Sequence, residues 1–390
     1  MSKSHDSMNT KRRGVSRREF LTRGAAAAGG LAAAPYLLGG TSAWAAVGDG
    51  ANVGGKLDVL NWILYIDKKS KKDFPKQTGI KLKYSDGIDD NNTFFAKYQE
   101  QFAAGDHIGF DIVTPTTWMA ARLIELGYVQ PMPLDLVENL GNLRPELQNP
   151  AWDPTGEYTV PWQTGYTGIA YNIEATGREI TSVEDLFDPA FEGKVGWLLE
   201  MRDSMTLAML STGMTRDEIA DGVTFEDARP AFDRLEDAAQ SGQIRRFTGN
   251  SYQRDLLSGD FALNVAWSGD VGQLSQTEPN LRFYVPDEGG HGYWADVMCM
   301  VATSERQEQV AAWCDYFYDP VNAARVANYT TYNSPVADIT DELAAINPEA
   351  AENPIFFPPA DVLERLVQFP LLDPDDEEKW DERYAEITGA

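Results

Sequence analysis

The sequence predicts an α/β protein made of two lobes. Apolar, strand-like segments alternate with amphipathic helical segments from Lys56 to about residue 130, and a second alternating series begins at Gly168. Loop-rich residues 149–165 separate the two series, and an apolar segment after Gly290 returns the chain toward the first. This spacing is typical of βαβ units in a mostly parallel sheet. Crossovers near residues 160–172 and 290–300 would join the lobes, and ligands in such folds bind beyond the carboxyl ends of strands and between lobes.

The first series has three expected strands and three expected helices. The strands are KLDVLNWILYI (56–66), GIKLKYS (79–85) and FDIVTPT (110–116), the last of which stops at Pro115. A Lys-rich helix separates the first two strands, and Pro75 within it predicts a shortened helix. NTFFAKYQEQFAAG (92–105) and TWMAARLIELGYV (117–129) have helical periodicity, with Gly105 and Gly127 at their ends.

The second series begins with GIAYN (168–172), which predicts a short buried strand. SVEDLFDPAFEGKVGWLLE (182–200) contains the next strand, and a long polar helical stretch follows it. FALNVAW (261–267), LRFYVPDEGG (281–290) and YWADVMCMVATS (293–304) are further strand candidates. RQEQVAAWCDYFYD (306–319) predicts a helix, and the acidic tail from Asp338 is expected to be helical.

The N-terminus predicts export by the twin-arginine route. Arg17 and Arg18 stand between Ser16 and Phe20, an Ala/Gly-rich run follows, and small residues mark a cleavage site near Ala45. No cysteine lies near that site, so we expect no lipid anchor there. The mature protein should therefore be soluble and periplasmic.

The charge balance argues against nucleic-acid and anionic membrane partners. The chain has 60 Asp and Glu against 33 Lys and Arg, a net charge of −27, and removal of residues 1–45 makes the mature chain more acidic still. Such a field repels anions and concentrates cations. The acidic charge is either a solvated shell, which a saline habitat favours, or serves in part to attract a cationic ligand.

Signatures of catalysis are scarce. The chain has three His, and none of them belongs to a zinc-protease motif; there is no nucleophile elbow, P-loop or dinucleotide fingerprint. No group of residues has metal-ligand spacing, so neither a metal nor a cofactor is expected. Cys299 and Cys314 could pair in an oxidising compartment, or could be two buried thiols. An exported enzyme remains the alternative from another functional class.

Aromatic and acidic residues recur together at the ends of the expected strands. The pairs are Trp62 with Tyr65, Thr116 with Trp118, Glu200 with Asp203, Trp267 with Asp270, and Trp294 with Asp296. Each has a structural explanation: a strand-end Trp is usually core, and Asp203 or Asp270 could cap a helix. A cationic organic ligand would explain all five pairs together, because carboxylates bind ammonium donors, and aromatic faces attract cations and cover methylene groups.

These stretches resemble the bacterial spermidine/putrescine-binding proteins of ABC transporters. The resemblance extends from about Lys56 to the C-terminus and rests on LNWILYI, TGIKLKYS, FDIVTPTTW, YTVPWQTGYTGIAYN, LLEMRDSMTLAML, NVAWSGDVGQ, YWADVMCMVAT and TTYNSPV, in family order. It implies a two-lobed periplasmic-binding-protein fold (type II) with the ligand cleft between the lobes. The family closes on its ligand like a hinge.

The resemblance also implies a function, a site and a set of lobes. The function is capture of a polyamine, with putrescine preferred over spermidine, by a monomer that delivers it to the membrane permease of an ABC transporter. An opine, a guanidino compound or an amine-sensing role are the alternatives. Lobe 1 would comprise 56–161 and 297–332, lobe 2 would be 162–296, and 333–390 would pack on them. The implied ligand-binding residues are Trp62, Tyr65, Thr116, Trp118, Glu200, Asp203, Trp267, Asp270, Trp294, Asp296 and Tyr332.

One departure from the family concerns the first loop. The family often has Ser or Thr directly after the first-loop Trp, whereas this chain has Ile63. One hydroxyl contact to the ligand is therefore expected to be missing.

Overall fold

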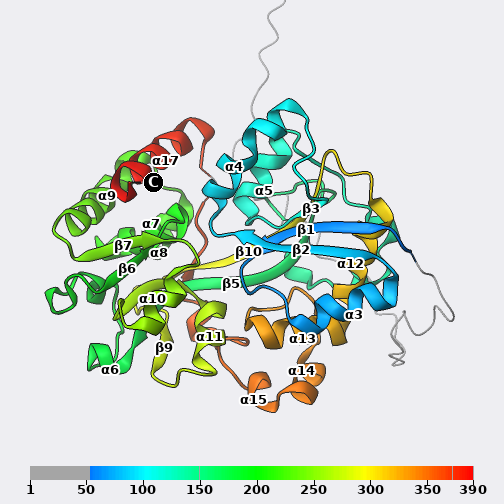
Figure 1. Cartoon of the computed structure of the whole chain (residues 1–390). Coiled ribbons are helices and arrows are strands. Elements are labelled where there is room, and N and C mark those ends of the chain that lie inside the picture. The colour runs from blue at the N-terminus through cyan, green and yellow to red at the C-terminus, as the bar shows by residue number, and fades with distance from the viewer. Residues whose placement is uncertain (1–52, 149, 371, 390) are drawn as a thin grey trace, which may run out of the picture. The chain divides into compact units, whose positions relative to one another are not determined.

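One mixed sheet organises the protein, which we describe from a computed structural model (Figure 1). The structure describes residues 53–148, 150–370 and 372–389, all within the unit Val47–Ala390. The predicted signal segment and its cleavage site lie outside the described residues. The sheet has 11 strands in the order β2-β1-β3-β10-β5-β8-β6-β7, with β4 and β11 beside β10 and β9 beside β5.

The strands and helices have the following bounds. The strands are β1 Lys56–Trp62, β2 Lys81–Ile88, β3 Ile112–Val113, β4 Val129–Gln130, β5 Thr159–Asn172, β6 Val195–Leu198, β7 Ile244–Thr248, β8 Leu263–Trp267, β9 Leu281–Tyr284, β10 Gly290–Val301 and β11 Leu366–Val367. The α-helices are α3 Lys68–Thr78, α4 Asn91–Ala104, α5 Thr117–Glu125, α6 Ile173–Thr176, α7 Met201–Ser211, α8 Arg216–Asp221, α9 Phe225–Gln240, α10 Tyr252–Ser258, α11 Ser268–Ser275, α12 Gln307–Tyr318, α13 Pro320–Thr330, α14 Thr340–Ile346, α15 Pro348–Ala351, α16 Ala360–Leu363 and α17 Pro374–Thr388.

The prediction of a mostly parallel sheet is wrong. The outer pairs β1–β2, β1–β3, β6–β7 and β6–β8 are parallel, as βαβ units require. The two long central strands β5 and β10 are antiparallel to each other, and each is antiparallel to its main neighbour on the other side. They cross the middle of the sheet in opposite directions because the chain leaves the first half and later returns to it.

The strand predicted at residues 168–172 is also longer than expected. β5 begins at Thr159 and has 14 residues, 13 of them buried. Pro161 lies within it, at the pairing position where the register with β10 shifts between Asp296 and Val297. Proline is tolerated in a strand at such an irregularity because it cannot donate a ladder hydrogen bond. The turn-rich composition of residues 149–165 concealed this half of the strand.

Two further elements differ from the expectations. β7 lies inside the stretch that we expected to be helical throughout, and it carries the sheet to its far edge. Pro75 does not shorten α3, which continues to Thr78 and is closed by Gly79 at φ 73°. The prediction that Pro75 shortens this helix is therefore wrong.

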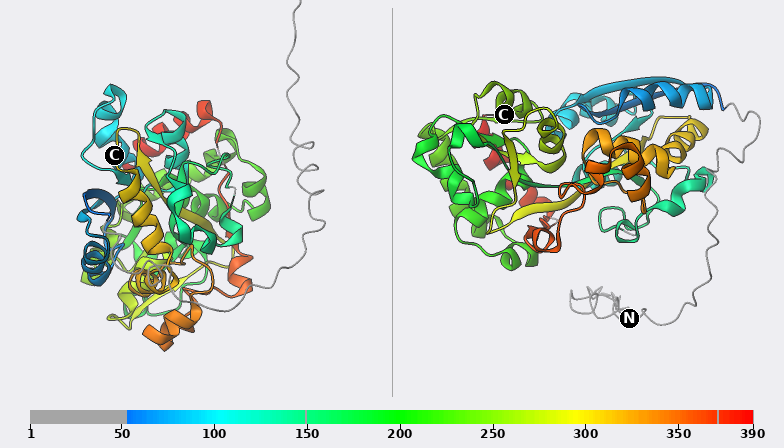
Figure 2. Two further views of the ribbon diagram at one scale, coloured as in Figure 1. Left: turned by 90° about the vertical axis from the view of Figure 1, so that its right-hand side faces the viewer. Right: turned by 90° about the horizontal axis from the view of Figure 1, so that it is seen from below.

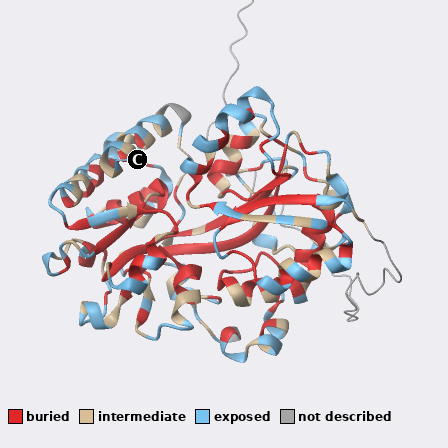
Figure 3. Cartoon of the chain, viewed as in Figure 1, coloured by how far each residue is buried: buried red, intermediate tan, exposed pale blue. Residues whose placement is uncertain are grey.

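Buried aromatic rings pack the helices against the sheet and against one another. Trp313 of α12 stacks on Trp162 of β5 at 5.8 Å between ring centroids, and Phe74 of α3 meets Trp313 edge-on at 5.1 Å. At the other end, Trp380 of α17 packs against Phe232 of α9 at 5.2 Å. The central strands lie deep between these layers, and exposed residues are concentrated on the outer helices (Figure 3). Two further views show the helices on both faces of the sheet (Figure 2).

Candidate functional site

A cavity lies where the strand ends of the two halves of the sheet meet, and its volume, including the space open to solvent, is about 370 Å³. The lining residues are Trp62, Tyr65, Thr116, Glu200, Asp203, Asn250, Trp267, Asp270, Trp294, Asp296 and Tyr332. Ten of the eleven residues predicted from the sequence are therefore brought together, with Asn250 added and Trp118 left out. The lining contains four carboxylates and no Lys, Arg or His.

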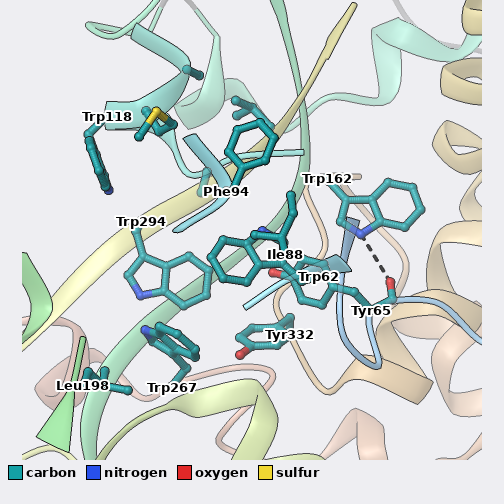
Figure 4. Packing of buried hydrophobic residues seen from close by; sticks show 14 of the residues in the cluster. Trp62, Tyr65, Ile88, Phe94, Trp118, Trp162, Leu198, Trp267, Trp294 and Tyr332 are labelled. Carbon is teal, nitrogen blue, oxygen red and sulfur yellow. Dashed lines mark hydrogen bonds between the residues drawn. The ribbon is translucent and has the colours of Figure 1, made fainter. Parts of the chain in front are cut away.

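Aromatic rings form most of the apolar wall (Figure 4). Trp62 meets Trp267 edge-on at 6.0 Å, a contact between residues of the first and second series. Tyr332 meets Tyr65 at 5.1 Å and Trp294 at 5.5 Å, also edge-on. Such contacts between buried rings typically contribute about 0.5–1.5 kcal/mol beyond their buried area. The rings therefore form one connected surface that can lie against an alkyl chain.

Each of the three indole N–H groups of this wall has a protein acceptor. Trp62 Nε1 donates to Thr114 O at 2.8 Å, and Trp294 Nε1 donates to Thr167 Oγ1 at 3.2 Å. Trp267 Nε1 donates to Asp203 Oδ1 at 3.1 Å. These hydrogen bonds hold the rings in place and leave their faces as the surface offered to a ligand.

Asp296 has hydrogen bonds that fix the orientation of its carboxylate. Tyr65 donates its hydroxyl to Oδ2 at 2.6 Å and Thr116 donates to Oδ1 at 2.7 Å. Trp162 Nε1 in turn donates to Tyr65 O at 3.3 Å, which holds the loop after β1 (Figure 4). Burial raises the pKa of Asp296 to about 7. Each carboxylate oxygen has two acceptor sites, so each retains one for a ligand.

Asp270 is held by a second set of donors. Asn250 Nδ2 and Tyr252 Oη donate to Oδ2 at 2.6 and 2.7 Å, and Tyr332 Oη donates to Oδ1 at 2.9 Å. Burial raises the pKa of Asp270, and these hydrogen bonds oppose that rise. The alternative that Asp270 caps a helix is wrong, because α11 has no side-chain cap and begins after Trp267.

Glu200 is the N-cap residue of α7, and Asp203 lies in the first turn of that helix. Asp203 Oδ1 accepts from Thr167 and from the Trp267 indole, and Glu200 Oε1 accepts from Asn91 N and Nδ2, both at 2.9 Å. Their other oxygens accept no hydrogen bond from any residue that the structure describes. Burial, followed by the nearby Asp203 charge, raises the pKa of Glu200 to about 8. Capping by Asp203 is also wrong, because α7 has no side-chain cap.

Two glycines allow the aromatic wall to close. A Cβ on Gly269 would lie 2.3 Å from the Tyr332 ring, and a Cβ on Gly165 would lie 2.6 Å from the Trp294 ring. Contacts that short do not occur in proteins, so either side chain would displace a ring of the wall.

Trp118, in the first turn of α5, lies outside the cavity lining. The Arg202 guanidinium covers its ring at 3.9 Å from the centroid and forms an ion pair with Glu377 of α17. A cation of the protein itself thus occupies the aromatic face that we expected to meet a ligand cation. Only 7% of Arg202 is exposed, which makes this contact part of the packed interior.

Sequence reasoning missed several polar residues that orient the acids. Asn250 comes shortly after β7, just as the predicted aromatic and acidic pairs come at or after the ends of their strands. Because β7 was not recognised as a strand, the position of Asn250 at a strand end was not noticed. Asn91 and Thr167 contact the acids from α4 and β5. Nothing in their local sequence distinguishes them from ordinary cap and strand residues.

The described part of the chain also bears on metal binding, on thiol chemistry and on membrane insertion. Across residues 53–148, 150–370 and 372–389, no group of His, Cys, Asp and Glu is arranged to hold a metal ion. Cys299 and Cys314 are both buried, free thiols. None of the described helices combines the length and apolarity needed to cross a bilayer.

Comparisons with known proteins show the family to which the chain belongs. The family model described as "Bacterial extracellular solute-binding protein" matches residues 69–358. The putrescine-binding periplasmic protein PotF of Escherichia coli is 26% identical, over 82% of this chain and 87% of that protein. A spermidine/putrescine-binding periplasmic protein of Salmonella typhimurium is also 26% identical, over 86% of this chain and 90% of that protein.

A solved structure has the same fold. The spermidine/putrescine ABC transporter substrate-binding protein PotD of Streptococcus pneumoniae superposes with a TM-score of 0.69 at 22% identity, covering 86% of this chain and 98% of that one. This likeness confirms the predicted two-lobed fold of the periplasmic-binding type. Because the family model matches most of the chain, the protein belongs to the bacterial extracellular solute-binding protein family and is a binding protein rather than an enzyme.

Proposed function

We propose that this protein is an exported receptor that captures a polyamine and delivers it to the permease of an ABC transporter, with putrescine preferred over spermidine. The observation that carries the proposal is a buried cavity whose polar lining includes four carboxylates and no basic side chain. A cationic ligand would neutralise these acids, and the polyamine-binding relatives described above support the same class of ligand.

The ten predicted residues that line the cavity are the proposed ligand contacts. Asp296 and Asp270 each retain free acceptor sites beside a tyrosine hydroxyl, and their tyrosines, Tyr65 and Tyr332, touch edge-on at 5.1 Å. An alkyl diamine placed along these rings would present its methylenes to the aromatic wall and its ammonium groups to the acids. Asp203 and Glu200 supply the remaining open carboxylate oxygens.

The absence of a basic side chain from the lining disfavours an opine as the ligand. An opine carries carboxylates, and these would be buried beside four acids with no Lys, Arg or His in the lining to pair with them. A guanidino compound without a carboxylate does not suffer this penalty and remains the second candidate. It is a cation, and its planar group can form bidentate hydrogen bonds with a carboxylate.

One observation supports a short ligand. The ring of Trp118, which lies outside the cavity lining, is covered by the Arg202 guanidinium. A third ammonium group that extended toward Trp118 would meet the Arg202 charge. We therefore propose that putrescine fits better than spermidine.

The remaining parts of the proposal concern motion, location and assembly. We propose the lobe boundaries given above, with β5 and β10 as connections about which lobe 1 (56–161 and 297–332) and lobe 2 (162–296) close. The segment 333–390 would pack on both. We further propose that the protein is a monomer in the periplasm, exported by the twin-arginine route without a lipid anchor. The periplasmic names of its relatives support that location.

Calorimetric titration of the purified protein with putrescine and with spermidine tests the proposed function. We expect binding of one putrescine per chain, weaker binding of spermidine, and a higher melting temperature with either amine. If neither amine gives heat or raises the melting temperature, the polyamine proposal is wrong. Tighter binding of agmatine than of putrescine would favour the guanidino alternative.

A further inference from the structure

The lysines of this protein are concentrated in one βαβ unit. Eight of the eleven lysines after residue 52 lie within residues 56–86, on or beside β1, α3 and β2. This segment has four Asp and no Arg or Glu, so its net charge is +4. Residues 87–390 carry 18 basic and 53 acidic side chains, a net charge of −35. We call the group Lys56, Lys68, Lys69, Lys71, Lys72, Lys76, Lys81 and Lys83 the lysine patch.

The lysine patch is an exposed surface at one edge of the sheet. All of its side chains are exposed except that of Lys71, which is half-buried. β2 is the outermost strand, and α3 packs beside it (Figure 1). In Figure 1 and in the right-hand view of Figure 2, the patch elements lie at the opposite end of the unit from α9 and α17, whose sequences are rich in acid. The charge is therefore polarised along the protein.

Part of the patch charge is available to a partner. Lys69 and Lys76 pair with Asp73, and Lys56 pairs with Asp58 at 3.4 Å. Lys68, Lys72 and Lys81 have no acidic side chain of the described residues within 4.0 Å.

The overall charge of the chain argues against anionic membranes, but the lysine patch is a local exception to it. We propose that the lysine patch binds the anionic headgroups of a lipid bilayer and orients the protein on the membrane surface. The amino-acid type favours lipid over an acidic protein surface. Specific protein interfaces are enriched in Arg, whose planar fork forms bidentate pairs, and depleted in Lys. Outside the patch this chain uses 15 Arg and three Lys after residue 86, whereas the patch is entirely Lys. Mobile point charges suit a diffuse anionic surface, which attracts each Lys independently.

The overall negative charge determines at which salt concentrations the lysine patch can bind lipid. At low ionic strength the −35 of the remaining chain repels an anionic surface at a distance. At about 0.1 M salt the Debye length is about 10 Å, so that repulsion is screened while lysines in contact still bind. At high salt the contacts are screened as well. Binding should therefore pass through a maximum as salt increases, a pattern that a uniformly basic protein would not show.

The test is co-sedimentation of the purified protein with vesicles of phosphatidylcholine alone or mixed with phosphatidylglycerol, over a range of salt. The patch variant is Lys68→Gln/Lys72→Gln/Lys81→Gln, which breaks no ion pair. The matched control is Lys97→Gln/Lys194→Gln/Lys379→Gln, which removes the same charge from three exposed lysines elsewhere. We expect the wild type and the control to bind only the phosphatidylglycerol vesicles, and the patch variant to bind them at least about tenfold more weakly.

Several outcomes would overturn the proposal. One is that the wild type fails to bind phosphatidylglycerol vesicles at any salt concentration. Another is that the patch variant and the control variant lose the same amount of vesicle binding.

Lysine on an edge strand can also prevent strand-to-strand association. If the patch variant self-associates in sedimentation velocity but binds vesicles as the wild type does, the lysines protect β2 and the lipid proposal fails. If it binds vesicles normally but no longer supports uptake by permease-containing vesicles, the partner is protein. Equal amine affinities would show that all variants are folded.

Discussion

Replacing Asp296 by Asn should weaken amine binding and stabilise the ligand-free protein at the same time. Asp296 is 4% exposed and lies between the hydroxyls of Tyr65 and Thr116. Asparagine has the same shape, can accept from Thr116 through its carbonyl oxygen, and can donate to the Tyr65 oxygen. The substitution therefore removes a charge without opening a void.

The expected loss of affinity follows from the lost ammonium–carboxylate hydrogen bond. A hydrogen bond to a charged group contributes about 1.5–3 kcal/mol, which corresponds to about 10- to 100-fold in dissociation constant. Calorimetric titration with putrescine measures this loss. An unchanged dissociation constant would show that Asp296 does not contact the ligand.

The expected gain in stability follows from the raised pKa. The pKa of Asp296 rises from 3.8 to about 7, so the folded protein holds this proton more tightly than the unfolded chain does. Wild-type stability therefore decreases as pH rises from about 4 to 7, and at 1.36 kcal/mol per pKa unit the decrease is at most about 4 kcal/mol. Asparagine removes this loss. At pH 8 the ligand-free variant should melt several degrees above the wild type, and at pH 4 the two should be similar. A lower melting temperature at pH 8 would refute this reasoning.

Two other predictions concern the same cavity. Putrescine affinity should rise with pH up to about 8 and then level off, because Asp296 (pKa about 7) and Glu200 (pKa about 8) must lose protons to pair with an amine that stays protonated. Titration in buffers of different ionisation enthalpy should detect proton release, and a pH-independent affinity would contradict this account. Gly269→Ala should weaken binding at least about tenfold, because its Cβ would displace the Tyr332 ring. Gly141→Ala, where a Cβ meets nothing within 4 Å, is the control and should bind normally.

Most residues of the candidate site could be predicted because they lie at or shortly after the ends of apolar segments that are recognisable as strands. The apolar segments at 56–66, 110–116 and 261–267 were recognisable from their composition, and the aromatic and acidic residues that follow them do meet in one cavity. Within each half of the sheet, parallel strands bring their carboxyl ends together. Because β8 runs opposite to β1 and β3, the meeting of the two sets depends on the antiparallel central strands β5 and β10, which no local pattern indicates.

The errors arose where long-range packing decides the outcome. Pro161 and the glycines of residues 149–168 suggest turns, yet pairing with β10 extends β5 through them. No local feature indicates that Arg202 of α7 covers Trp118 of α5, since these residues are distant in sequence and the contact depends on how the helices pack. Asn250 was missed because the charged surface of β7 concealed a strand of the same type as the others.

The most direct test of the central claim is native mass spectrometry of the purified protein with equal concentrations of putrescine, spermidine and γ-aminobutyrate. The four carboxylates of the cavity and its lack of a basic side chain predict a polyamine complex, and the Arg202 charge over Trp118 predicts one bound putrescine as the main one. The spermidine complex should be minor, and the γ-aminobutyrate complex absent because its carboxylate would remain unpaired. A main complex with γ-aminobutyrate, or no complex with any of the three, would contradict the proposed function.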